Sequence, residues 1–138
     1  MLLNFTVENF RSFKGRCELW MKAADETLGL ETHVAEVGDV RVLRTAAIFG
    51  ANASGKSNLF QAMALALGLL RSPDEGERRA WLASAQPFRF SAEAVDFPTE
   101  FEFDFLVQGE RYQYDFSVLK GTILSESLCL YGEEYSHP

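Results

Sequence analysis

The stretch FGANASGKSN, residues 49–58, constrains the fold of this chain more than any other part of the sequence. It matches the pattern G-x-x-x-x-G-K-[ST] at Gly50, Gly55, Lys56 and Ser57. The apolar run VLRTAAIF (42–49) precedes it and predicts a buried strand, whereas KSNLFQAMALALGLL follows it and predicts a helix. A strand, a glycine-rich loop and a helix in this order are the context that a phosphate-binding loop requires.

Each residue type in this loop has a chemical reason to bind a nucleoside triphosphate. Glycines permit backbone conformations in which successive N–H groups converge on phosphate oxygens, and the start of a helix adds unpaired donors. We expect Lys56 to reach the β- and γ-phosphates and the Ser57 hydroxyl to bind Mg²⁺. The alternative is an ordinary glycine-rich turn that ends in Lys-Ser. The sequence therefore predicts a site for ATP and Mg²⁺ made by Gly50, Ala51, Asn52, Ala53, Ser54, Gly55, Lys56, Ser57 and Asn58.

Length and composition bound the class of protein. With 138 residues, 47% of them hydrophobic, the chain is long enough for one domain with a core. The amino-terminal stretch MLLNFTVENFRSF already has charged and polar residues within its first dozen positions, which argues against a signal peptide or a membrane anchor. We therefore expect a cytoplasmic, soluble protein with no membrane partner.

Net charge and the spacing of cysteines and histidines limit which nucleic-acid and metal partners the chain can have. The net charge is −7, and a clamp for duplex DNA usually shows a basic footprint, so other surfaces would have to hold any nucleic acid. Cys17 and Cys129 lie far apart without metal-ligand spacing, and we expect both to be buried and reduced. His33 and His137 are isolated, so the sequence assembles no metal cluster.

The segments around the loop predict further elements. LLNFTVENF predicts a first strand over 2–8, RSFKG a turn, and RCELWMKA a second strand that completes a hairpin. Residues 23–40 are mixed and polar, and we expect a loop with a short helix. RSPDEGERRA (71–80) contains Pro73 and Gly76 and predicts a surface loop.

Residues 99–131 show the clearest alternation in the chain. Three apolar-polar runs, separated by turns at Gly109 and Gly121, predict a three-stranded antiparallel meander. Its aromatic face is expected to belong to the core rather than to a platform for stacking bases. That face consists of Phe101, Phe103, Phe105, Val107, Tyr112, Tyr114, Phe116 and Val118. The helix over 57–70 is apolar on nearly every side, which predicts more covering layers than this chain supplies.

The order VENFRSF, then AAIFGANASGKSNLFQAM, then an aromatic meander introduced by PTEFEF resembles the N-terminal lobe of ABC-type ATPases. The resemblance is to the branch with the RecF, SMC and OLD (overcoming lysogenization defect) proteins, and within it to bacterial AAA family ATPases often linked with phage defence. It extends from Leu2 to Tyr131.

The implied fold class is mixed α/β. Strands flank a phosphate loop and its helix, and an antiparallel meander follows. The implied organisation is one partial domain over 1–138, with a second lobe absent. It consists of the hairpin, loop strand and helix (1–70), a surface loop region (71–98) and the meander (99–131).

The resemblance also extends the site beyond the loop. It implies that Arg11 and Ser12, on the turn after the first strand, lie close to the nucleotide. The alternative is that Arg11 is a surface side chain while Phe10 and Phe13 belong to the core.

Several parts that such ATPases need for hydrolysis have no match in the sequence. They are an apolar run ending in Asp-Glu, a signature segment of the L-S-G-G type and a downstream histidine. The segment SLCLYGEE (127–134) imitates the first but has Gly132 where the aspartate should stand, and Glu133 and Glu134 are weak candidates. None of Gln86, Gln108 and Gln113 can be assigned to the Mg²⁺-contacting glutamine. No catalytic residue is therefore assigned.

Two functions follow from these observations. The first is the ATP-binding lobe of an ABC-type ATPase in DNA transactions or phage defence. Hydrolysis would then need a C-terminal lobe and a partner subunit, with a homodimer expected for the full protein. The second is a non-hydrolysing, nucleotide-responsive module for protein interaction. A small-molecule kinase fits less well, because such kinases alternate parallel strands with helices.

Overall fold

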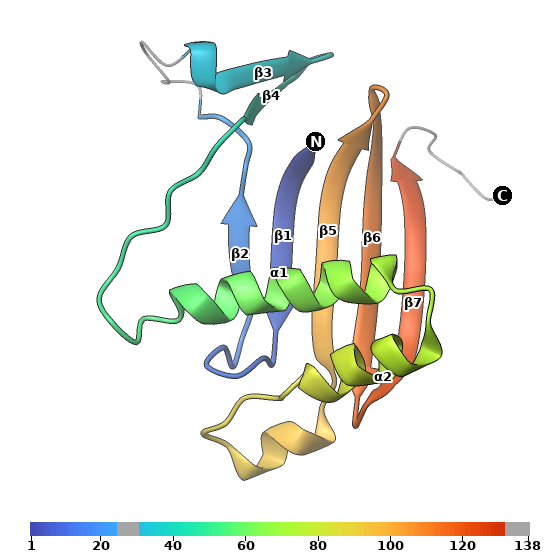
Figure 1. Cartoon of the computed structure of the whole chain (residues 1–138). Helices are drawn as coiled ribbons and strands as arrows, with labels where there is room; N and C mark the ends of the chain where they lie inside the picture. Colours follow the sequence, from blue (N-terminus) through green and yellow to red (C-terminus); the bar gives the residue numbers. More distant parts are fainter. Residues whose placement is uncertain (25–30, 132–138) are drawn as a thin grey trace, which may run out of the picture.

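A five-stranded antiparallel sheet, ordered β2-β1-β5-β6-β7, carries a helix across one face in the computed structural model (Figure 1). The structure describes residues 1–24 and 31–131. The strands are β1 Leu2–Glu8, β2 Cys17–Trp20, β3 Val34–Val37, β4 Val40–Leu43, β5 Thr99–Val107, β6 Glu110–Leu119 and β7 Thr122–Tyr131. The helices are α1 Lys56–Arg71 and α2 Glu75–Ser84, with short 3₁₀ turns η1 Glu31–His33 and η2 Ala92–Asp96. This mixed α/β fold confirms the predicted class.

The first hairpin and the meander form as the sequence predicts. Strand β1 has the expected bounds and pairs antiparallel with β2, which is shorter than the apolar run suggested. In the meander, both turns place two consecutive residues at positive φ: Gln108 (54°) with Gly109 (91°), and Lys120 (49°) with Gly121 (77°). Two left-handed residues in a row define the hairpin turn whose twist matches that of the flanking strands.

Most of the aromatic face of the meander lies in the core, as predicted, but Val107 at the end of β5 is 47% exposed, which differs from the prediction. The Phe101 and Phe116 rings stack with centroids 4.8 Å apart, and Phe5 packs on Phe103 at the same centroid distance. Phe101 is only 1% exposed, and burying a side chain of this size stabilises a fold by about 1.5–3 kcal/mol. Helix α1 covers this face with Leu59, Ala62, Leu65, Ala66 and Leu69.

The remaining sides of α1 are only partly covered. Phe60 is 58% exposed, and Leu67 and Leu70 are exposed as well. This agrees with the expectation that a helix apolar on nearly every side has more apolar surface than the chain covers. Within residues 1–24 and 31–131, no helix combines the length and apolar character needed to cross a bilayer.

Helix α2 corrects the surface loop expected over 71–80. The Asp74 side chain caps the helix by accepting hydrogen bonds from the backbone N–H groups of Gly76 (2.8 Å) and Glu77 (3.0 Å). Pro73 lies before the cap and Gly76 in the first turn, where neither interrupts the helical hydrogen bonds. The Trp81 ring then packs against Gly68 of α1. Capping and packing thus outweigh the two breaker residues.

The strand predicted over 42–49 is also corrected. Only Val42 and Leu43 are in a strand, and they belong to β4, which pairs with β3. Residues 45–51 have no regular secondary structure, and Phe49 is 89% exposed rather than buried. A strand needs a hydrogen-bonded neighbour, and in the described part of the chain no strand pairs with this segment.

Two smaller expectations also differ from the structure. The polar segment 23–40 includes the predicted short helix, as η1, but also strand β3, whose hairpin with β4 buries Val42 against Leu3 and Leu106. Residues 25–30 lie outside the described part. Both cysteines are free, yet Cys17 is only half-buried at the border of the core, and Cys129 is exposed on β7, where nearly every residue is exposed.

Candidate nucleotide-binding site

The phosphate-loop motif lies at the amino-terminal end of α1, in a backbone conformation that glycine favours. Gly55 precedes the helix with φ = 96°, and Ala53 also has a positive φ, 64°. No side chain caps this helix end, and no acidic residue lies in its first turn. The first N–H groups of α1 are therefore available to an anion, and the helix dipole favours negative charge there.

Lys56 brings its positive charge into the loop. Its Nζ donates hydrogen bonds to the carbonyl oxygens of Gly50 (2.8 Å) and Ala51 (2.7 Å), and it lies 3.4 Å from the Ser54 hydroxyl. The loop thus curves around the ammonium group, where a phosphate oxygen would find both a cation and the backbone donors of the helix.

Space and backbone conformation both favour glycine at position 55, whereas at position 50 only space does, and the neighbouring atom is the movable Ser54 hydroxyl. A Cβ on Gly50 would lie 2.7 Å from the Ser54 hydroxyl oxygen, and a Cβ on Gly55 would lie 2.9 Å from a carbon of the Phe13 ring. The site therefore has the close-fitting backbone that a phosphate cradle needs. These residues fit ATP, and the Ser57 hydroxyl is exposed at the first turn of α1, where it is available to Mg²⁺.

The turn after β1 packs against the loop, so the structure brings Arg11 and Ser12 to the predicted site. The Asn58 amide donates to the Ser12 hydroxyl at 2.7 Å, and the Arg11 guanidinium donates to Oε1 of Gln61 on α1. Phe13 lies against Gly55.

The alternative for this turn, in which Arg11 is a surface side chain while Phe10 and Phe13 belong to the core, also holds in part. Phe10 is fully buried in the core, and Phe13 packs at its border. Arg11 is half-buried, and its Nε is buried without a hydrogen-bond partner. Contact of Arg11 or Ser12 with a nucleotide stays a prediction.

Asn9 anchors this turn, a role that sequence reasoning missed. Asn9 is buried at φ = 50°, and its amide donates to the carbonyl oxygens of Ala94, Phe97 and Pro98 at 2.9–3.1 Å. Its Oδ1 accepts a hydrogen bond from the Phe88 backbone N–H. An asparagine directly after a strand is a weak signal for a left-handed turn, but its distant partners leave no local trace in the sequence.

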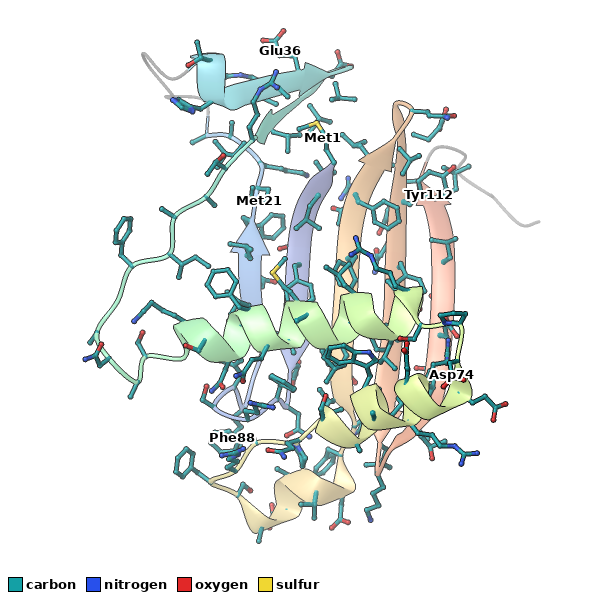
Figure 2. The ribbon with its side chains drawn as sticks, viewed as in Figure 1. Met1, Met21, Glu36, Asp74, Phe88 and Tyr112 are labelled. Carbon is teal, nitrogen blue, oxygen red and sulfur yellow. The ribbon has the colours of Figure 1, made fainter. Side chains whose placement is uncertain are left out.

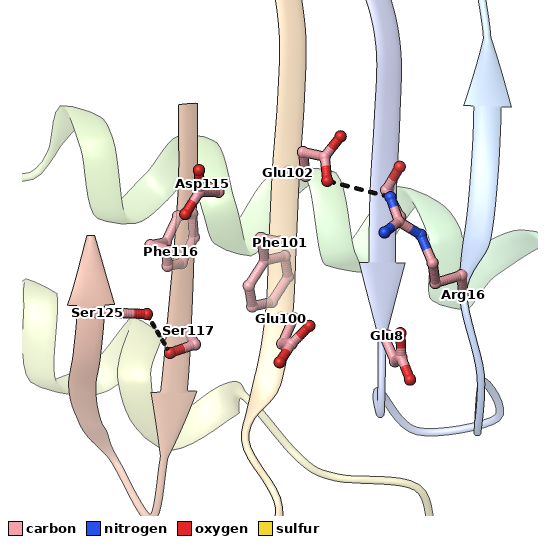
Figure 3. A pocket seen from close by; sticks show the side chains of 10 residues that line it. Glu8, Arg16, Glu100, Phe101, Glu102, Asp115, Phe116, Ser117 and Ser125 are labelled. Carbon is pink, nitrogen blue, oxygen red and sulfur yellow. Dashed lines mark hydrogen bonds and ion pairs between the residues drawn. The ribbon is translucent and has the colours of Figure 1, made fainter. Parts of the chain in front are cut away.

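A second pocket, of about 210 Å³, lies on the face of the sheet opposite α1 (Figure 3). Four carboxylates line it, Glu8, Glu100, Glu102 and Asp115, and Arg16 is the one cation, with Nη2 3.1 Å from Glu102. This excess of negative charge repels a triphosphate, so the pocket is no alternative to the loop. Within the described residues, no group of three or more His, Cys, Asp or Glu side chains is arranged to hold a metal ion.

The other sequence candidates are dispersed. Gln86, Gln108 and Gln113 lie on the segment after α2, the β5–β6 turn and β6, and Gln113 accepts a hydrogen bond from Tyr131. Glu133 and Glu134 lie outside the described residues. The structure therefore gathers only the loop and the turn after β1 into one site.

Comparison with known proteins agrees with this geometry. The sequence model of a family described as an AAA domain, putative AbiEii toxin of a type IV toxin–antitoxin system, matches residues 46–134. The match begins just before the phosphate loop and continues through the meander, and it covers more than half of the chain. No curated protein matches the chain at a significant level. The chain therefore belongs to this AAA domain family and is an ATPase-like, nucleotide-binding lobe.

Proposed function

We propose that the chain is the ATP-binding lobe of an ABC-type ATPase of the RecF, SMC and OLD kind. The observation that carries the proposal is the uncapped start of α1, with Gly55 left-handed before it and the Lys56 ammonium group inside the loop. Phosphate oxygens would take the place of the Gly50 and Ala51 carbonyls as partners of Lys56. Backbone N–H groups of residues 50–58 would complete the cradle.

The side chains around the loop would bind Mg²⁺, hold the first turn of α1 and add a second positive charge. Ser57 would bind Mg²⁺, which supplies charge neutralisation at the β- and γ-phosphates. Ser12 holds Asn58 by a hydrogen bond and so fixes the first turn of α1. Arg11, held by Gln61, would place a second cation beside the phosphates.

Hydrolysis in this proposal depends on groups from elsewhere. A bound triphosphate is cleaved when an acidic group orients water and cations stabilise the transferred phosphoryl group. The four carboxylates that line one pocket, Glu8, Glu100, Glu102 and Asp115, lie on the face of the sheet opposite α1. We therefore assign the catalytic acid to a C-terminal lobe and the remaining contacts to a partner subunit, in a homodimer.

The biological setting is part of the same proposal. We keep both settings in the proposal, phage defence and DNA transactions in the cytoplasm; the family description names a toxin of a type IV toxin–antitoxin system. With a net charge of −7, this lobe would leave any contact with nucleic acid to other surfaces.

Calorimetric titration with Mg·ATP tests the proposal. Lys56→Ala removes the cation from the loop, and because a charge-assisted hydrogen bond contributes about 1.5–3 kcal/mol, we expect ATP affinity to fall by at least about tenfold. Lys22→Ala removes an exposed lysine outside the loop and serves as the matched control. Equal affinities in wild type and Lys56→Ala would refute the site.

The second candidate function is a nucleotide-responsive module that does not hydrolyse ATP. The exposed apolar side chains Phe60, Leu67 and Leu70 on α1 favour it, because such a surface suits a protein partner. Phosphate release in the presence of Mg²⁺ separates the two functions when a longer chain is assayed. Turnover that disappears in Lys56→Ala supports the ATPase, whereas tight ATP binding without turnover supports the module.

A further inference from the structure

A hollow of about 570 Å³ lies beside the turn after β1, lined by residues 86–92 and Val95. We infer that this hollow is the nucleobase subsite of the ATP site, with the Phe90 ring as the surface on which the base stacks. The inference rests on the proposed function and adds to it the part of the ligand that the phosphate loop does not contact.

The first observation is an aromatic ring without a covering group. Phe90 is 83% exposed, although a phenylalanine usually finds cover in a folded domain. Its ring meets that of Phe88 edge-on, with centroids 5.6 Å apart and an interplanar angle of 64°. Phe88 thereby contacts one side of the Phe90 ring and leaves the rest of the Phe90 ring accessible to a planar base.

The second observation is the direct connection between this segment and the phosphate loop. The Arg11 N–H donates to the Gln86 carbonyl at 3.0 Å, and the Arg89 N–H donates to the Arg11 carbonyl at 2.9 Å. The same turn holds the loop from its other side, through Ser12 with Asn58 and Phe13 with Gly55. Figure 2 shows Phe88 below the amino-terminal end of α1, the end that carries the loop.

The third observation is the polar chemistry around the ring. The Arg89 guanidinium donates to Oε1 of Gln86 at 2.5 Å, which holds both side chains at the rim of the hollow. The Gln86 amide retains its N–H donors, and the Ser91 hydroxyl also lines the hollow. An apolar surface with a few polar groups at its edge is the usual composition of a small-molecule site.

The test compares ATP with inorganic tripolyphosphate, which has no base, by titration calorimetry on the full chain with Mg²⁺. Since stacking on an aromatic side chain contributes measurably to base binding, Phe90→Ala should weaken ATP binding about tenfold and leave tripolyphosphate binding unchanged. Phe90→Trp retains a stacking surface and should retain ATP affinity. Phe97→Ala, an exposed phenylalanine that does not line this hollow, is the matched control.

The outcomes separate this inference from the function on which it rests. If Lys56→Ala weakens both ligands but Phe90→Ala weakens neither, the nucleobase subsite is wrong and the phosphate site stands. If Phe90→Ala weakens both ligands equally, Phe90 acts on the fold and the inference also fails. If ATP binding is insensitive to Lys56→Ala, both proposals fail. Phe90→Trp also controls for folding, because a loss of ATP affinity in this variant contradicts stacking.

Discussion

Replacing Gly68 by alanine tests the packing that orients α1, and its expected effect has the opposite sign to the usual one. In a helix interior, alanine is about 1 kcal/mol more favourable than glycine. A Cβ on Gly68 would, however, lie 2.3 Å from Cε2 of the Trp81 ring, 2.6 Å from Cδ2 and 2.7 Å from Cζ2. Contacts this short force the ring or the helix to move, and overpacking of this kind costs about 1–3 kcal/mol.

Subtracting the gain of about 1 kcal/mol in helix propensity from the overpacking cost predicts that Gly68→Ala lowers the free energy of unfolding by up to about 2 kcal/mol. Urea denaturation followed by circular dichroism measures this change. The matched experiment repeats the substitution in a Trp81→Ala background, where the ring is gone and only the propensity effect remains. There, Gly68→Ala should stabilise the chain by about 1 kcal/mol, so the double-mutant cycle gives a coupling of about 1–3 kcal/mol.

The refuting result is a change of the same sign in both backgrounds. If Gly68→Ala stabilises the wild type, α2 does not press its tryptophan onto α1. Helix α2 would then lack the packing on α1 that distinguishes it from the surface loop expected over 71–80.

Two further predictions concern the loop and the thiols. Gly55→Ala should lower the free energy of unfolding by about 1–3 kcal/mol, because the residue has φ = 96° and faces Phe13. The substitution should also weaken Mg·ATP binding. Urea denaturation measures the first effect and calorimetry the second, and an unchanged affinity would contradict the cradle geometry. Alkylation at pH 8, followed by mass spectrometry, should modify Cys129 well before Cys17, because burial raises the pKa of the Cys17 thiol, with the neighbouring Glu18 adding to the effect, and so lowers its thiolate fraction. Equal rates would contradict the difference in exposure between the two thiols.

The elements that local pattern specifies were predictable from the sequence. Strand β1 follows from an apolar, β-prone run, helix α1 from a run of helix formers without proline, and the three meander strands from apolar-polar alternation. Gly109 and Gly121 locate the turns between the meander strands. The loop motif could be recognised because the chemistry of phosphate binding dictates its residue types and spacing. Its contact with phosphate stays a prediction.

Elements that depend on distant neighbours were not predictable in the same way. Residues 42–49 have the composition of a buried strand, but strand formation needs a hydrogen-bonded partner and not only apolar side chains. Helix α2 follows from the Asp74 cap and from the fit of Trp81 on Gly68, which are tertiary facts that override Pro73 and Gly76. The Asn9 contacts with residues 88 and 94–98 span the sequence and leave no periodic signal.

The corrected position of residues 45–51 changes how the loop must be held. A phosphate loop binds tightly only if its backbone donors are oriented before the ligand arrives. No strand pairs with the segment before the loop in the described part of the chain, although Ile48 packs against the core there. On its other side the loop is held by the packing of Gly55 against Phe13 and by the hydrogen bond between Asn58 and Ser12.

These two contacts are made by the turn after β1, which the core holds through buried Phe10 and the hydrogen bonds of Asn9. Orientation of the phosphate donors therefore depends on β1 and its turn more than on the segment that precedes the loop in sequence. Any group that pairs with residues 45–51 would add a second support, and would tighten nucleotide binding without itself contacting the nucleotide. That is a physical route by which a second lobe could regulate this site.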